Sequence, residues 1–92
     1  MTNTIAEIIG MFAGILGVIA WLPQLKRVWI EKKHDGISLP TFSVVTIALI
    51  LWLIYGILIG SPSVIGANVA ALTMILALIV GVVVLRANDE LK

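Results

Sequence analysis

A few polar and aromatic side chains interrupt a chain that is otherwise almost wholly apolar. An indole beside an amide can hold a neutral polyhydroxylated ligand, because the ring packs on C–H surface while the amide exchanges hydrogen bonds with hydroxyls. Polar groups in hydrocarbon also need a partner or a water-lined cavity, so their positions are informative. The candidates are Trp21, Gln24, Trp52, Tyr55 and Asn68.

The elements that must position these side chains follow from the hydropathy of the chain. Of its 92 residues 61% are hydrophobic and 12% are charged, and the mean hydropathy is +1.18, which indicates an integral membrane protein. A spanning helix needs about 20 apolar residues, and three runs provide them: Ile5–Leu25, Thr41–Ile59 and Pro62–Leu85. They predict one all-α domain over residues 1–92, a bundle of three transmembrane helices at roughly 5–30, 40–59 and 62–86.

The two connections between these helices differ in kind. The first is a basic, aqueous loop with a turn at Asp35-Gly36, after which Ser38 is placed to cap the second helix. The second is only Gly60-Ser61-Pro62, a helix-stopping glycine, a capping serine and a helix-starting proline. A tight antiparallel hairpin of the second and third helices is therefore expected.

The distribution of basic residues predicts the orientation in the membrane, because Lys and Arg accumulate on the cytoplasmic side. The first loop and the C-terminus would share one side, and the other side holds no basic residue. We expect the N-terminus outside and the C-terminus in the cytoplasm. The first ten residues lack the basic flank of a secretory signal, so the first run is expected to be a retained span. The basic residues are Lys26, Arg27, Lys32, Lys33, Arg86 and Lys92.

The tight hairpin allows the depth of two candidate residues to be compared. Trp52 precedes the outer end of the second helix by seven residues and Asn68 follows the outer start of the third by six, so both lie roughly 10 Å inside. Tyr55 lies one turn nearer the outside on the same helix face. A sugar would suit this pair. A purely structural alternative stays open: Trp52 filling a helix interface, Tyr55 in the interfacial aromatic belt and Asn68 making an interhelical hydrogen bond.

Several function classes have little support in the residues. The middle of each span holds no charged residue and no histidine, which favours facilitated diffusion over proton coupling. His34 lies in the aqueous loop, where a solvated or capping role is expected. No metal constellation, catalytic set or phosphate loop is present, so we expect no cofactor, no metal and no enzyme. The net charge of +1 argues against a nucleic-acid partner.

Two features of the first helix raise questions of packing. Pro23 cannot donate to the carbonyl of Ile19, so the helix is expected to kink or divide nearby. Gly10 and Gly14 form a GxxxG pair that either packs the first and third helices within one protomer or joins two copies. Three helices are too few to enclose a solute path, so transport would require self-association. Trp21 is assigned to packing, and Trp29, beside the basic loop, to the interfacial aromatic belt.

An ordered set of motifs gives the chain a family resemblance. It resembles the PQ-loop proteins, and among them the SemiSWEETs, bacterial half-size relatives of the SWEET sugar transporters. The motifs are Pro23-Gln24, DGIS at 35–38, LWLIYG at 51–56 and Ala67-Asn68.

The resemblance implies a parallel homodimer of six helices in the bacterial cytoplasmic membrane, carrying mono- or disaccharides by alternating access. It assigns sugar contacts to Trp52 and Asn68 of both protomers, the inner hinge to Pro23-Gln24 and the outer gate to Tyr55. Some family members close that gate with an Arg and an Asp at positions that match Ile59 and Ser61. We therefore expect closure by apolar and aromatic contact here.

Two alternatives remain open at this stage. One is a PQ-loop carrier of another small solute such as an amino acid, although no charged side chain at midplane depth could pair with a zwitterion. The other is a non-transporting membrane subunit that scaffolds a complex. A multidrug exporter is disfavoured, because Glu7 lies near the outer end of the first helix and not in the middle of the membrane.

Overall fold

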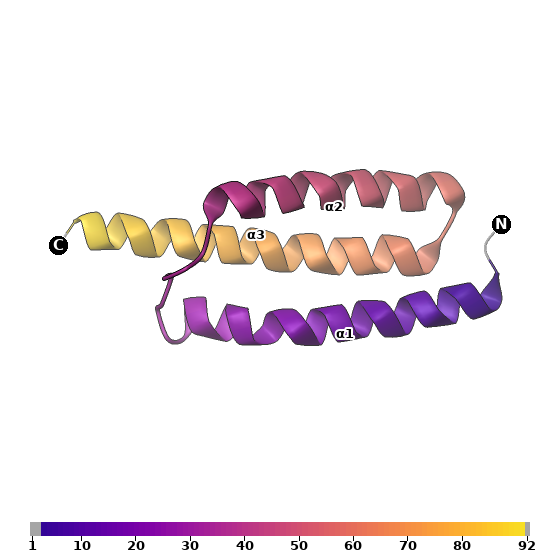
Figure 1. Cartoon of the computed structure of the whole chain (residues 1–92), viewed down its shortest axis with the longest axis horizontal. Coiled ribbons are helices and arrows are strands. Elements are labelled where there is room, and N and C mark those ends of the chain that lie inside the picture. Colours follow the sequence, from indigo (N-terminus) through magenta and orange to yellow (C-terminus); the bar gives the residue numbers. More distant parts are fainter. Residues whose placement is uncertain (1–2, 92) are drawn as a thin grey trace.

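The computed structural model describes residues 3–91, which form three long helices (Figure 1). Each helix is long and apolar enough to cross a membrane, so the predicted all-α membrane fold is confirmed. Lys92, which entered the orientation argument, lies outside the described residues. The third helix extends one turn beyond the predicted end, and Asp89 in that turn contacts His34 of the first loop. The helices are α1 (Thr4–Trp29), α2 (Leu39–Ile59) and α3 (Pro62–Glu90).

The third helix lies between the other two. Both α1 and α2 pack along α3, and Figure 1 shows α3 running between them. The first two helices meet through side chains, as where the rings of Trp21 and Phe42 are edge to face with centroids 6.0 Å apart. A residue of α3 can thus face both α1 and α2.

The predicted caps and the tight hairpin are confirmed. Gly60 has φ of 67°, a left-handed conformation that glycine adopts without strain, and its N–H bonds to the carbonyls of Gly56 and Ile57. Ser61 Oγ then accepts from the N–H of Val64 at 3.3 Å to begin α3. Ser38 Oγ accepts from the N–H of Thr41 at 3.2 Å in the same way at the start of α2.

The best-packed region lies at the end of the bundle that carries the first loop. By the predicted orientation we call it the inner end and the opposite one the outer end. A Cβ built on Gly81 would lie 2.6 Å from Val28 Cγ1, so α1 and α3 are as close there as glycine permits. The indole N–H of Trp29 donates to the carbonyl of Ala77 at 3.1 Å, which makes Trp29 a packing residue as well as a candidate belt residue. The cluster of buried side chains here comprises Val28, Ile37, Leu78 and Val82.

Pro23 does not divide the first helix. α1 is continuous from Thr4 to Trp29, so of the two expected outcomes, a kink or a division, the division is wrong. Only the bond to the Ile19 carbonyl is lost, and the turns on both sides retain their own bonds. Pro23 therefore lies within α1 as a point with one fewer backbone bond.

Candidate functional site

A cavity of about 440 Å³ lies among the three helices and brings the two principal candidates together. Trp52 reaches it from α2 and Asn68 from α3, as their estimated common depth suggested. On the α1 side four small residues leave the volume open, and two larger side chains, Val18 and Trp21, complete the wall. No charged residue lines this cavity. The small residues of that wall are Gly10, Ala13, Gly14 and Gly17.

Asn68 lines the cavity and has one side-chain acceptor that is not used within the protomer. The residue is only 9% exposed, and its Nδ2 donates to the carbonyl of Val64 in its own helix at 2.7 Å. Its Oδ1 has no partner among residues 3–91, where every buried side-chain N or O atom has one, so that oxygen must be accessible. Among the described residues of one protomer Asn68 makes no interhelical hydrogen bond, so an acceptor is left for a hydroxyl, and the role of Asn68 in binding stays a prediction.

Trp52 is held by an aromatic neighbour but is not enclosed by its own protomer. Its side chain is 55% exposed, and its ring meets Tyr55 edge to face with centroids 5.3 Å apart. Trp52 therefore does not fill an interface within the protomer. Its open surface can take a ligand, a second copy or lipid, and its role in binding stays a prediction.

The sequence reasoning missed Trp21 as a cavity residue. Trp21 was assigned to packing, and it does pack against Phe42 and the buried cluster. It also lines the cavity, which therefore has a second indole among its walls. The spacing contained a signal: Gly14, Gly17 and Trp21 share one helix face, so two small residues precede a large ring.

The predicted hinge residues lie away from the cavity. Pro23 and Gln24 are exposed on α1 and do not line it. The neighbouring loop is tied to its surroundings by arginine side chains: Arg27 Nη2 donates to the Asp35 carbonyl at 2.8 Å and Arg86 Nη2 to the Ile37 carbonyl at 2.6 Å. The inner end is thus held by polar bonds as well as by packing.

His34 is not simply solvated. Its Nε2 lies 2.6 Å from Asp89 Oδ2, and its Nδ1 accepts from Arg86 Nε at 3.4 Å. These contacts join the first loop to the last turns of α3. Sequence reasoning could not find them, because 52 to 55 residues separate the partners.

The outer end is joined by Glu7. Its carboxylate accepts from Ser61 Oγ at 2.6 Å, from Ser63 N–H at 2.9 Å and from Ser63 Oγ at 3.1 Å. Ser61 is 1% exposed and committed to these bonds, while Ile59 is 37% exposed. Of the two positions that match the family's gate ion pair, Ser61 is therefore buried and hydrogen-bonded within the protomer.

The GxxxG pair packs within the protomer. Cβ atoms built at Gly10 and Gly14 would lie 2.5 Å from Ser63 Oγ and 3.1 Å from Ala67 Cβ, so both glycines bring α1 against α3. By contrast, a Cβ at Gly17 or Gly66 would meet nothing within 4 Å. No three His, Asp or Glu side chains between residues 3 and 91 gather as a metal site.

Comparison with known proteins finds one matching family model and several similar proteins. The model of the PQ loop repeat family matches residues 5–65. A protein of Bradyrhizobium diazoefficiens named sugar transporter SemiSWEET is 38% identical over 77 residues, covering 84% of this chain and 87% of that protein. An uncharacterized protein of Methanocaldococcus jannaschii is 36% identical over 85 residues, covering 92% and 87%. A SemiSWEET of Leptospira biflexa is 35% identical over 66 residues, covering 72% and 78%. No solved structure matches significantly.

Proposed function

The chain belongs to the PQ-loop repeat family, with SemiSWEETs among its relatives, and from this premise we propose that it is a facilitative sugar transporter. The family is one of transporters and not of enzymes. The proposed substrates are mono- or disaccharides. They would cross the bacterial cytoplasmic membrane by alternating access through a parallel homodimer, with the C-terminus in the cytoplasm.

The observation that carries this proposal is the lining of the 440 Å³ cavity. It presents the Trp52 indole and the accessible Asn68 Oδ1 together, with no charged residue among its walls. A sugar offers C–H faces to an indole and hydroxyls to an amide. A zwitterion would leave its carboxylate and ammonium without charged partners in this cavity, which disfavours an amino acid.

The exposure of two aromatic side chains supports a homodimer. The three helices of one protomer leave Trp52 and Tyr55 about half exposed, at 55% and 49%. A second copy facing the same side would enclose the path and contribute its own Trp52 and Asn68. The GxxxG pair is already used between α1 and α3, so the contact between copies would use other residues.

The moving parts are proposed from position. Pro23 lacks one backbone bond near the cytoplasmic boundary, so α1 can bend there and open the inner side of the path, with Gln24 beside it. Tyr55 lies one turn outward of Trp52 and would close the outer side by aromatic contact. With no ionisable group in mid-span, the sugar would move down its own gradient.

The site is tested by flux into liposomes that contain the purified protein. Labelled glucose or sucrose should enter without any ion gradient, and Trp52→Ala or Asn68→Ala should reduce entry to that of empty liposomes. Leu76→Ala is the matched control, since Leu76 is 48% exposed on α3 and lines neither cavity. Undiminished flux in both site variants would rule out this assignment of the cavity.

A further inference from the structure

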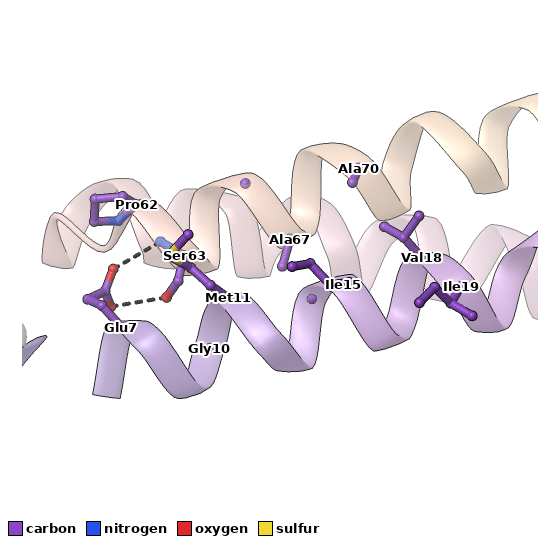
Figure 2. A pocket seen from close by; sticks show the side chains of 12 residues that line it. Glu7, Gly10, Met11, Ile15, Val18, Ile19, Pro62, Ser63, Ala67 and Ala70 are labelled. Atoms are coloured by element: carbon purple, nitrogen blue, oxygen red, sulfur yellow. Dashed lines mark hydrogen bonds between the residues drawn. The ribbon is translucent and has the colours of Figure 1, made fainter. Parts of the chain in front are cut away.

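A second cavity, of about 560 Å³, lies between α1 and α3 and is separate in most of its lining from the candidate sugar site (Figure 2). No residue of α2 lines it, whereas α2 contributes Trp52 to the first cavity. We call it the α1–α3 groove. Its walls are almost entirely apolar side chains, and Glu7 stands at one end.

The groove exists because small residues line α3 opposite large residues on α1. Gly66 and Ala70 form much of the α3 side, and a Cβ at Gly66 would meet nothing within 4 Å. Met11, Ile15 and Ile19 follow the α1 side and are all more than half exposed. In a membrane such an exposed apolar groove faces lipid unless another chain covers it.

The groove has the length of one acyl chain. From Glu7 to Ile19 is twelve residues of α1, or about 18 Å at 1.5 Å per residue. One leaflet contributes about half of a hydrocarbon core of roughly 30 Å. A single lipid tail that entered beside Glu7 would therefore fit within the groove along its length.

Glu7 determines which head group would fit. It is the only charged side chain in residues 1–25, and residues 39–85 contain none, so no basic side chain lies at this end of the bundle. Its carboxylate accepts three hydrogen bonds, and with about four acceptor sites one is left over. The positive end of the α3 dipole is already turned to Glu7, so a head group that has no cation gains little at this place.

We propose that the α1–α3 groove binds a phospholipid with a primary ammonium head group, of the phosphatidylethanolamine class, in the leaflet at the Glu7 end. One acyl chain lies in the groove, and the ammonium donates to the carboxylate of Glu7. A second copy of this chain fits less well, because a parallel partner brings no basic side chain to this level and would leave Glu7 without a cation. The inference requires the membrane-spanning fold and does not depend on sugar transport.

Native mass spectrometry of the purified protein tests the head group and the groove separately. The probe is an equal mixture of phosphatidylethanolamine and phosphatidylglycerol with identical acyl chains. The unaltered chain should retain the former over the latter by roughly three- to tenfold, as a charge-assisted contact at a partly exposed site allows. Glu7→Gln should bring that ratio close to one.

Gly66→Leu should remove bound lipid of both kinds, since its side chain enters open groove volume and leaves the bonds of Glu7 intact. Val69→Leu is the matched control, because Val69 is 48% exposed on α3 outside the groove, and lipid retention should be unchanged. Gly66→Leu and Val69→Leu together test lipid binding in the groove even if Glu7→Gln destabilises the start of α3.

The proposal is overturned if Glu7→Gln keeps the full preference, or if Gly66→Leu retains lipid as well as Val69→Leu does. The chain has no cysteine, so Ala70→Cys provides a single thiol inside the groove for oxidative crosslinking in membranes. A crosslinked dimer through that position would mean that a second copy covers the groove, which also contradicts the lipid assignment. Absence of the crosslink is the expected result.

Discussion

Among single residues, Glu7 has the largest structural role at the outer end. Its carboxylate receives hydrogen bonds from Ser61 and Ser63 at the first turn of α3, and so joins the first helix to the third. A negative charge at a helix N-terminus is favourable, and bonds to an ionised acceptor are stronger than neutral ones. Ser61 acts twice, since its Oγ also accepts from the N–H of Val64.

We predict that Glu7→Ala and Ser61→Ala each lower the temperature of thermal unfolding in detergent. The double variant should lose less than the sum of the two, because both changes remove the same hydrogen bond. Glu31→Ala is the control. Glu31 Oε1 lies 3.9 Å from Lys33 Nζ on the surface, and such exposed ion pairs contribute little to stability. Strictly additive losses would show that Glu7 and Ser61 act independently.

The residues that sequence reasoning placed correctly are those whose partners are local. Ser38 and Ser61 cap helices through bonds to residues three positions on, as their places before the second and third helices predicted. The Glu7–Ser61 bond spans 54 residues. It depends on α3 lying against α1, which no local pattern indicates.

At the scale of helices, the packing of α1 on α3 is fixed by close contacts at its two ends. Gly10 and Gly14 allow it at the outer end, and Gly81 allows it at the inner end against Val28 and Trp29. The sequence predicted α2 beside α3, because only Gly60 and Ser61 lie between them. It left the position of α1 open, since a GxxxG pair can join helices within or between copies.

We predict that Gly81→Ala destabilises the protein by about 1–3 kcal/mol, the usual cost of overpacking, because its Cβ would lie 2.6 Å from Val28. Gly17→Ala is the matched control. Its Cβ would meet nothing within 4 Å, so stability should be unchanged or rise by up to about 1 kcal/mol from helix propensity. Unfolding in denaturant measures both, and equal stability of the two variants would contradict the close contact.

The proposed hinge in α1 makes a prediction about rate. Pro23→Ala restores the missing backbone donor inside a continuous helix, so it should stiffen α1 and slow sugar flux several-fold while the folded protein is no less stable. Initial rates in liposomes and thermal unfolding are to be compared. Full flux with Pro23→Ala would remove the reason for assigning the inner hinge to Pro23-Gln24.

At the scale of the whole molecule, packing and polar bonds hold both ends of the bundle, and the two cavities lie between the helices. At the outer end Glu7 joins α1 to α3. At the inner end the close contact at Gly81 joins the same two helices, and the hydrogen bonds of Arg86, one of them to His34, join α3 to the first loop. Three spanning helices followed directly from hydropathy, whereas the order with α3 in the middle did not. The common level of Trp52 and Asn68 could be estimated from the hairpin, but Trp21 reached their cavity only through tertiary packing.

The orientation is a prediction for the intact cell. With basic residues confined to the last turn of α1, the first loop and the C-terminal end, a cytoplasmic reporter fused after Lys92 should be active inside the cell. The thiol of Asn3→Cys should react with an impermeant reagent added outside. A C-terminal reporter active only outside would reverse the assignment of every inner and outer feature.

The central claim, downhill movement of a neutral sugar through the Trp52–Asn68 cavity, is tested most directly by the endpoint of uptake into liposomes. Labelled sugar should rise inside to the outside concentration and stop there. An imposed pH gradient of either sign should leave that endpoint unchanged, since no ionisable group lies in mid-span. Asn68→Ala should abolish the uptake of labelled sugar. Accumulation above the outside concentration under a pH gradient, or equal uptake by Asn68→Ala, would contradict the account.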